Sequence, residues 1–239
     1  MLAFKEYSVE RDLYNYTFNF LDPKFYDYGR KARSGTEIAP VLWDDIHKAL
    51  GTADDLSTKQ SIAEAFLRDY AEKHHAVLSR CLAMVSEYWD GVEAEFLSKA
   101  TGFFELGDYA PEPVKVYLTT LNVCSYNTEE RFFFIPFVGG LPRQAKVIMH
   151  ELFHFLFLEN YRGYLRENGM SGQDILDINE ALVCMLNLLF RDNLMLPERD
   201  YKPAAEPLKR RTIEMYERGV PFGGILEDLI AYKKSPNQC

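Results

Sequence analysis

The sequence of 239 residues has only four cysteines, and none of them forms a paired motif. Cys81, Cys124, Cys184 and Cys239 are widely and irregularly spaced, without the Cys-x-x-Cys pair that a metal ribbon or a redox site uses. A cysteine-based metal site or redox centre therefore has no support. We expect these residues to be free thiols in a reducing compartment.

The chain also lacks an excess of positive charge. Its formal net charge is −9, so nucleic acid or an anionic membrane would be repelled over most of the surface. The densest basic stretch, residues 209–211, is short and lies between Glu206 and Glu214. We therefore expect neither a nucleic acid nor a membrane as a partner.

Long apolar runs are missing as well. None reaches the roughly 18 to 20 residues that span a bilayer, because charged or polar residues such as His150 and Glu159 interrupt the best candidates. The N-terminus meets Lys5 and Glu6 before it builds the apolar core of a signal peptide. With 47% hydrophobic and 14% aromatic residues, the sequence predicts a globular, cytoplasmic protein with a substantial core.

One apolar stretch holds the residues best suited to chemistry. Residues 141–160 read LPRQAKVIMHELFHFLFLEN and contain the pattern His-Glu-x-x-His at His150, Glu151 and His154. Residues four apart on an α-helix lie about 40° apart around its axis, so the two histidines can share one metal ion. Glu151 lies about 100° from His150 and can instead reach a water held on that ion. The pattern predicts a zinc-binding helix with an adjacent carboxylate base.

The composition of this helix strengthens the prediction. It is apolar on nearly every side, so we expect it to be buried between a sheet and other helices. A buried His or Glu is costly unless it is paired or coordinated. A backbone carbonyl can satisfy one core histidine, but a metal ion explains the set of three polar residues better.

A hydrolytic zinc site needs a third protein ligand and an open fourth position. Residues 172–191 have the apolar pattern of a buried amphipathic helix, and this helix carries Glu180 directly after Asn179. We expect the first helix to end near Tyr161, and a glycine-containing loop to return the chain antiparallel. Glu180 can then face the two histidines.

The sequence resembles the gluzincin metallopeptidases, which include the thermolysin-like enzymes and the zinc aminopeptidases. The residues that match are His150, Glu151 and His154 on the first helix and Asn179 and Glu180 on the second, within roughly residues 113–192. The resemblance implies Zn²⁺ held by two histidines and Glu180, with Glu151 as the general base. It also implies a peptide substrate that adds as a strand to a sheet edge within residues 114–138.

The chain departs from that family at several positions. Thermolysin-like enzymes have an Asp four residues after the ligand Glu, to hold a histidine, where this chain has Cys184. Asn179, Asp177 and Asp174 are our candidates for that supporting role. Both aspartates also suit the N-terminus of a helix whatever the function.

Two further family features are missing or unassigned. The aminopeptidase motif Gly-x-Met-Glu-Asn is absent, so recognition of a free N-terminus has no support. No histidine follows Glu180, which leaves Tyr201, Tyr216 and Tyr232 as candidates for stabilising a tetrahedral intermediate.

The periodicity along the chain predicts an α+β fold that is mostly helical, zincin-like, with a small mixed sheet packed on the motif helix. Pro136 indicates that part of the second strand lies at an edge. The expected segments are an extended arm or strand in residues 1–25, a loop at 27–36, helices at 41–50, 204–218 and 222–233, and strands at 114–121 and 131–138. Residues 58–101 are expected to form either one long helix or two consecutive ones. Residues 1–110 form an N-terminal arm and helical region and 111–239 a catalytic region, unless the two are one continuous domain.

These observations favour a zinc metallopeptidase that hydrolyses peptide bonds in a peptide or protein substrate. An alternative is a catalytically inactive gluzincin-like module that binds a peptide or a protein. Hydrolysis of a non-peptide bond would use the same site with a different pocket. The sequence leaves the oligomeric state open.

Overall fold

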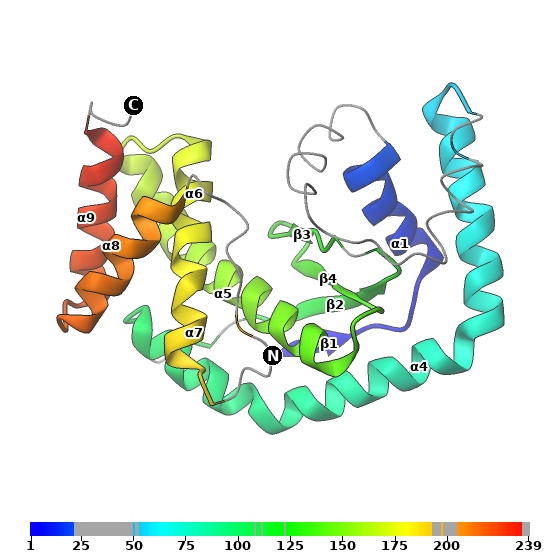
Figure 1. Ribbon diagram of the computed structural model, residues 1–239, viewed down its shortest axis with the longest axis horizontal. Coiled ribbons are helices and arrows are strands. Elements are labelled where there is room, and N and C mark those ends of the chain that lie inside the picture. Colours follow the sequence, from blue (N-terminus) through cyan, green and yellow to red (C-terminus); the bar gives the residue numbers. More distant parts are fainter. Residues whose placement is uncertain are drawn as a thin grey trace. The chain divides into compact units, whose positions relative to one another are not determined.

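The computed structural model describes residues 1–21, 50, 53–107, 109–110, 112–121, 123–192, 197 and 205–235 (Figure 1). The chain forms two compact units. The first unit comprises residues 1–89 and 112–147, and the second comprises residues 90–111 and 148–239. The long helices α4 (Leu56–Phe103) and α5 (Gly140–Glu167) contribute to both. The predicted division into residues 1–110 and 111–239, or into one domain, stays a prediction.

The first unit contains a mixed sheet of four strands in the order β1-β2-β4-β3. The strands are β1 (Leu2–Phe4), β2 (Val114–Thr119), β3 (Tyr126–Asn127) and β4 (Phe132–Pro136). β1, β2 and β4 are parallel to one another, and only β3 runs antiparallel to its neighbour β4. Both predicted strands are confirmed, within slightly shorter bounds, and so is the small mixed sheet in a mostly helical α+β fold.

Pro136 lies at a position of β4 where its lack of a backbone N–H group is tolerated. β4 is an inner strand, but β3 pairs only with Phe132 and Phe133 at its beginning. Pro136 ends the strand and pairs with Thr119 of β2 on the other side. A proline is tolerated at a position that has a ladder partner on one side alone.

The N-terminal segment differs from the expected strand or extended arm. Only β1 is extended; the chain then forms helix α1 (Val9–Tyr16) and a π-helical turn, η1 (Thr17–Leu21). Ser8 caps α1 by accepting a hydrogen bond from the Arg11 backbone N–H at 3.2 Å. The alternation of aromatic residues is typical of a strand, but here Tyr14 packs edge-on against Phe132 of the sheet from a helix.

A buried carboxylate joins α1 to the end of β2. Asp12 is fully buried and accepts hydrogen bonds from the Thr119 hydroxyl, from the Thr120 backbone N–H and hydroxyl, and from the Tyr7 hydroxyl. Burial raises the pKa of Asp12, although these hydrogen bonds oppose the shift. The side chain therefore fixes the N-terminal helix on the sheet.

Helix α4 is one continuous helix of 48 residues, so the helical prediction for residues 58–101 is confirmed, and the chain forms one long helix there rather than two consecutive ones. Its adjacent histidines, His74 and His75, are both exposed, as expected for neighbours that point in different directions on a helix. The predicted loop at residues 27–36 and the predicted helix at 41–50 lie outside the described residues, except for Leu50.

The second unit is helical. After the C-terminal part of α5 come α6 (Gly172–Leu182), the 3₁₀ turn η2 (Val183–Met185), α7 (Leu186–Leu189), α8 (Glu206–Glu217) and α9 (Phe222–Lys234). The two predicted C-terminal helices are thus confirmed. We expected α5 to end near Tyr161, but it continues to Glu167. The residue in the left-handed conformation that follows the helix is Gly169, with φ of +79°.

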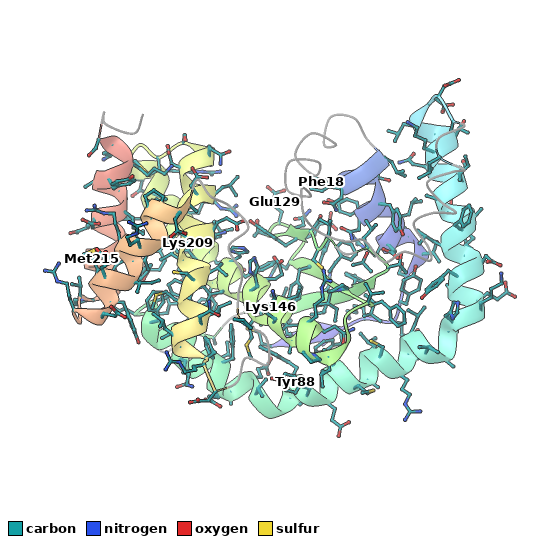
Figure 2. All side chains as sticks on the ribbon, viewed as in Figure 1. Phe18, Tyr88, Glu129, Lys146, Lys209 and Met215 are labelled. Carbon is teal, nitrogen blue, oxygen red and sulfur yellow. The ribbon has the colours of Figure 1, made fainter. Side chains whose placement is uncertain are left out.

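Aromatic side chains fill the core of the second unit. Phe104 packs on Phe153 of α5 with ring centroids 4.5 Å apart, and on Phe222 of α9 at 5.0 Å. Lys209 of α8, labelled in Figure 2, is also buried, with 7% of its surface exposed.

Within the described part of the chain, no helix combines the length and the apolar character needed to cross a membrane. Packing of the sheet on the motif helix stays a prediction.

Candidate metal centre

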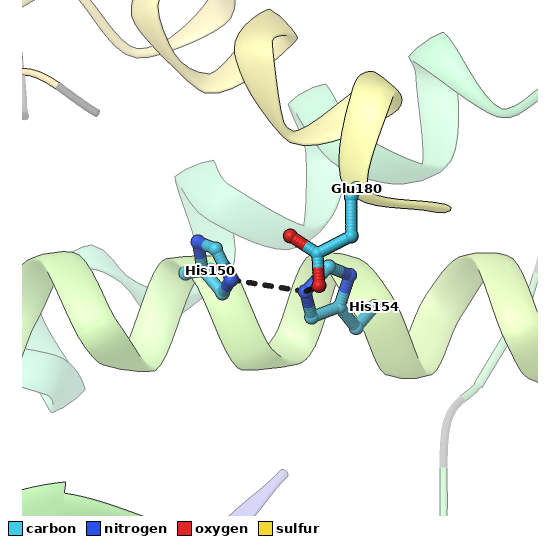
Figure 3. Close-up of side chains that lie close together, drawn as sticks. All are labelled: His150, His154 and Glu180. Atoms are coloured by element: carbon cyan, nitrogen blue, oxygen red, sulfur yellow. Dashed lines mark hydrogen bonds and ion pairs between the residues drawn. The ribbon is translucent and has the colours of Figure 1, made fainter. Parts of the chain in front are cut away.

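The two motif histidines meet on one side of α5. Because four residues make about one helical turn, His150 and His154 lie one above the other. Their Nε2 atoms are 2.9 Å apart, and their ring planes are nearly perpendicular at 87° (Figure 3). His154 is only 1% exposed, whereas His150 is half-buried. One ring nitrogen therefore donates a hydrogen bond to the other.

Glu180 reaches the histidines from α6. Its Oε1 lies 4.0 Å from the Nε2 of His154, and Figure 3 shows its side chain directed from α6 toward the pair on α5. One ligand atom from each of the three residues lies within 4.8 Å of the other two. The structure thus brings together the three residues that the sequence singled out, in a group that can hold a metal ion.

Local sequence explains why α6 presents Glu180 here. Ser171 and Asp174 form a capping box at the start of the helix, which fixes where the helix begins. Ile178 and Leu182 are fully buried on its apolar side. Because the beginning and the buried side of α6 are both set, the direction of Glu180 is set as well.

The spacing of the donor atoms suits a small divalent ion. Two ligands about 2.05 Å from a tetrahedral zinc ion are separated by about 3.3 Å. The observed separations of 2.9 Å between the histidine nitrogens and 4.0 Å from His154 to Glu180 lie on either side of that value. Two imidazoles and a carboxylate are also the donor set of many catalytic zinc sites. All three ligand atoms lie within 4.8 Å of one another, so the group could hold one metal ion.

Glu151 follows the first histidine in the sequence and is 5% exposed. Within the described residues, it is not a member of the three-residue group. This fits the offset of about 100° between adjacent helical residues, which turns Glu151 away from a ligand position. The role of Glu151 as a general base stays a prediction.

Asn179 is the polar residue of this region that most needs an explanation. Its side chain is 1% exposed, and neither its Oδ1 nor its Nδ2 has a hydrogen-bond partner among the residues that the structure describes. Leaving a buried amide unsatisfied is costly.

Asp174 and Asp177, the other candidates for holding a histidine, are directed elsewhere. The hydrogen bonds and ion pairs of Asp174 go to Ser171 and Lys233, and those of Asp177 to Gln173 and Lys233. Partial burial alone would raise the pKa of Asp174, but the bonds from Ser171 and Lys233 outweigh it and lower this pKa. Sequence reasoning missed Lys233, whose only signal was a position in the last turn of a predicted helix.

The remaining candidates lie in the packing of the helices. Cys184, at the position of the family's Asp, is half-buried and forms no disulfide bond with the described residues. Tyr216 packs edge-on against Phe103 at 5.8 Å, and the Arg211 guanidinium lies over the Tyr232 ring at 5.1 Å. Tyr201 lies outside the described residues.

The structure therefore defines a mostly helical α+β protein with a His-His-Glu group consistent with a zincin-like metal site. No protein-family model, curated protein or solved structure matches the chain. The geometry of the site itself has to support the functional conclusion.

Proposed function

We propose that this protein is a zinc-dependent metallopeptidase whose metal ligands are His150, His154 and Glu180. The observation that carries the proposal is the convergence of two imidazole nitrogens and a carboxylate oxygen, from two helices, within 4.8 Å of one another. Three such residues leave a fourth coordination position for water or substrate. The resemblance to the gluzincins in motif and order supports peptide as the substrate.

The bound ion would supply the Lewis-acid chemistry of this class, which lowers the pKa of a water and polarises a carbonyl. His150 and His154 would hold the ion together with Glu180, and the hydrogen bond that now joins the two histidines would be given up. Glu180 adds one negative charge, so the ligand set as a whole neutralises part of the ion's charge. Its placement on a separate helix makes the site dependent on the packing of α6.

Glu151 is the residue that moves the proton. Its buried carboxylate takes a proton from the attacking water and later gives it to the leaving amine. Asn179 has a different task, because its buried amide oxygen can accept a hydrogen bond from the Nδ1–H of a ligand imidazole and so fix the orientation of that ring. Cys81, Cys124 and Cys184 form no disulfide bond with the described residues, which suits a cytoplasmic setting for this enzyme.

The test combines metal analysis with a peptide-library digest read by mass spectrometry. Protein purified without added metal should contain about one zinc per chain and cleave peptides. The Glu151→Gln variant should keep the zinc and lose at least about a hundredfold in cleavage rate, because the amide cannot take the proton. Glu167→Gln, at an exposed position at the end of the same helix, is the matched control and should cleave like the parent.

Other outcomes favour other functions. Stoichiometric zinc without cleavage of any peptide would support the alternative, a catalytically inactive module that binds a peptide or a protein. Zinc together with hydrolysis of esters or amides but not of peptides would indicate a non-peptide substrate. Failure of the parent to bind zinc, even when zinc is added, would overturn the proposal.

A further inference from the structure

A single lysine of the last helix is bonded to two carboxylates of the helix that carries Glu180. The Lys233 Nζ in α9 lies 2.7 Å from the Asp177 Oδ2 and 3.3 Å from the Asp174 Oδ1, both in α6. The side chains of Lys233 and Asp177 are only 10% and 13% exposed. An ion pair this shielded is screened far less by water and salt than a surface pair.

The two carboxylates are also held at their other oxygens. Gln173 donates to the Asp177 Oδ1 at 2.7 Å, and Ser171 donates to the Asp174 Oδ2 within the capping box. Lys233 therefore completes a set of bonds around the first turns of α6. The first half of this helix has little freedom to turn about its own axis while those bonds remain.

Glu180 lies next to this set of bonds on the helix surface. It follows Asp177 by three residues, which places the two side chains about 60° apart around the axis. The carboxylate of such a side chain is about 6 Å from the axis, so a rotation of α6 by about 20° moves it by about 2 Å. That displacement is comparable to a whole metal–ligand bond, and it would spoil the coordination.

We propose that Lys233 is a positioning residue for the metal site, which fixes the rotation of α6 and thereby the place of Glu180 beside the two histidines. This inference rests on the proposed function, because it assumes that Glu180 is a metal ligand. Lys233 itself need not touch the ion or the substrate. Helix α9 thus helps to position a ligand of the metal site, although the His-Glu-x-x-His motif lies in α5.

Removing the lysine charge should disturb α6 more than removing an ordinary surface charge. In Lys233→Met, Asp177, only 13% exposed, and Asp174, 30% exposed, keep their negative charges without the cation between them. Their repulsion is relieved when the first turns of α6 move. Glu180 then loses its fixed position, although the apolar side of the helix remains packed.

The experiment compares the zinc affinity of the full-length parent and three variants by competition with a chromophoric chelator. Lys233→Met should weaken zinc binding by about five- to tenfold, somewhat less than the loss of a residue bonded directly to a ligand. Lys233→Arg keeps the charge and should bind zinc within about twofold of the parent. The absorption spectrum of the Co²⁺-substituted protein should change in Lys233→Met and return in Lys233→Arg, since it reports the ligand geometry.

Arg211→Met is the matched control. Arg211 of α8 makes a two-fold hydrogen-bonded ion pair with Asp228 of α9, at 2.7 and 2.8 Å. This pair also holds α9 in place, but neither of its members belongs to α6. Arg211→Met should therefore leave the zinc affinity within about twofold of the parent and the Co²⁺ spectrum unchanged.

The outcomes separate this inference from the proposed function. A parent that binds no zinc overturns both. A parent that binds zinc while Lys233→Met binds it equally well overturns the positioning role alone, and so does an equal loss in Arg211→Met. If Lys233→Met does not fold, Asp177→Asn removes the carboxylate partner instead; it should reproduce the loss of affinity, and an affinity like that of the parent would overturn the role.

Discussion

The Nε2 atoms of His150 and His154 lie 2.9 Å apart on successive turns of α5, close enough for only one proton between them. The contact follows from the four-residue spacing, which stacks the two rings on one face of the helix. A single ion bound to both histidines would take the place of this hydrogen bond. The stacked pair could therefore also bind one metal ion.

Replacing either histidine should therefore remove the metal. His150→Ala and His154→Ala should each retain less than about 10% of the zinc bound by the parent, because one imidazole and one carboxylate hold zinc poorly. Elemental analysis after gel filtration measures this. His74→Ala, at an exposed histidine of α4, should bind zinc like the parent. Full zinc content in both motif variants would show that the ion binds elsewhere.

Removal of the buried carboxylate in the first unit should lower stability. Asp12→Ala leaves the Thr119 hydroxyl, the Thr120 backbone N–H and the Tyr7 hydroxyl without their acceptor. We expect the free energy of unfolding to fall by about 3 kcal/mol, measured by urea denaturation with circular dichroism. Glu10→Ala, exposed on the same helix, should change it by less than about 0.5 kcal/mol. Equal effects of the two variants would contradict the role of the Asp12 network.

The ion pair between α9 and α6 should make stability depend on pH. Bonds from Ser171 and Lys233 hold the pKa of Asp174 below its ordinary value despite partial burial, so its ionised form favours the folded state. The stability advantage of the parent over Lys233→Met should be complete above about pH 4, the ordinary value for Asp, and vanish as the pH falls through the lowered pKa.

At the alkaline end, the bonds from Asp177 and Asp174 raise the pKa of Lys233 in spite of its burial. The same advantage should be lost only above the ordinary lysine value of about 10.4. Urea denaturation of both proteins across this range measures the difference. An advantage that persists unchanged at pH 2 would mean that packing of the lysine stem, rather than its charge, stabilises the contact.

Two glycines should respond in opposite ways to alanine. Gly91 lies exposed within α4, where an added Cβ meets nothing within 4 Å, so Gly91→Ala should stabilise the protein by about 0.5–1 kcal/mol. Gly139 has φ of +99°, and a Cβ there would lie 2.4 Å from the Arg143 Cδ. Gly139→Ala should destabilise the protein by more than about 1 kcal/mol. Thermal unfolding of the two variants and the parent tests both predictions. A Tm of Gly91→Ala below that of the parent would contradict the prediction for α4.

Sequence patterns predicted the elements whose character is local. The apolar period and the lack of proline indicated α4 as one possible continuous helix, and the proline-punctuated C-terminal stretch indicated α8 and α9. The N-terminal helix was missed because its aromatic residues alternate along the sequence. Their burial depends on the sheet beneath them, which the residues of that segment do not encode.

The sequence by itself determined that His150 and His154 stack on one face of α5, because backbone hydrogen bonding fixes the helical period at 3.6 residues per turn. The sequence also singled out Glu180 as the third ligand, but only the tertiary structure shows that it reaches the histidines. Asp174, Asp177 and Glu180 all lie on α6, and packing directs the first two to Lys233 and the third to the histidines. Contacts between helices depend on how their buried faces fit together, and this fit is a property of the whole unit rather than of any one segment.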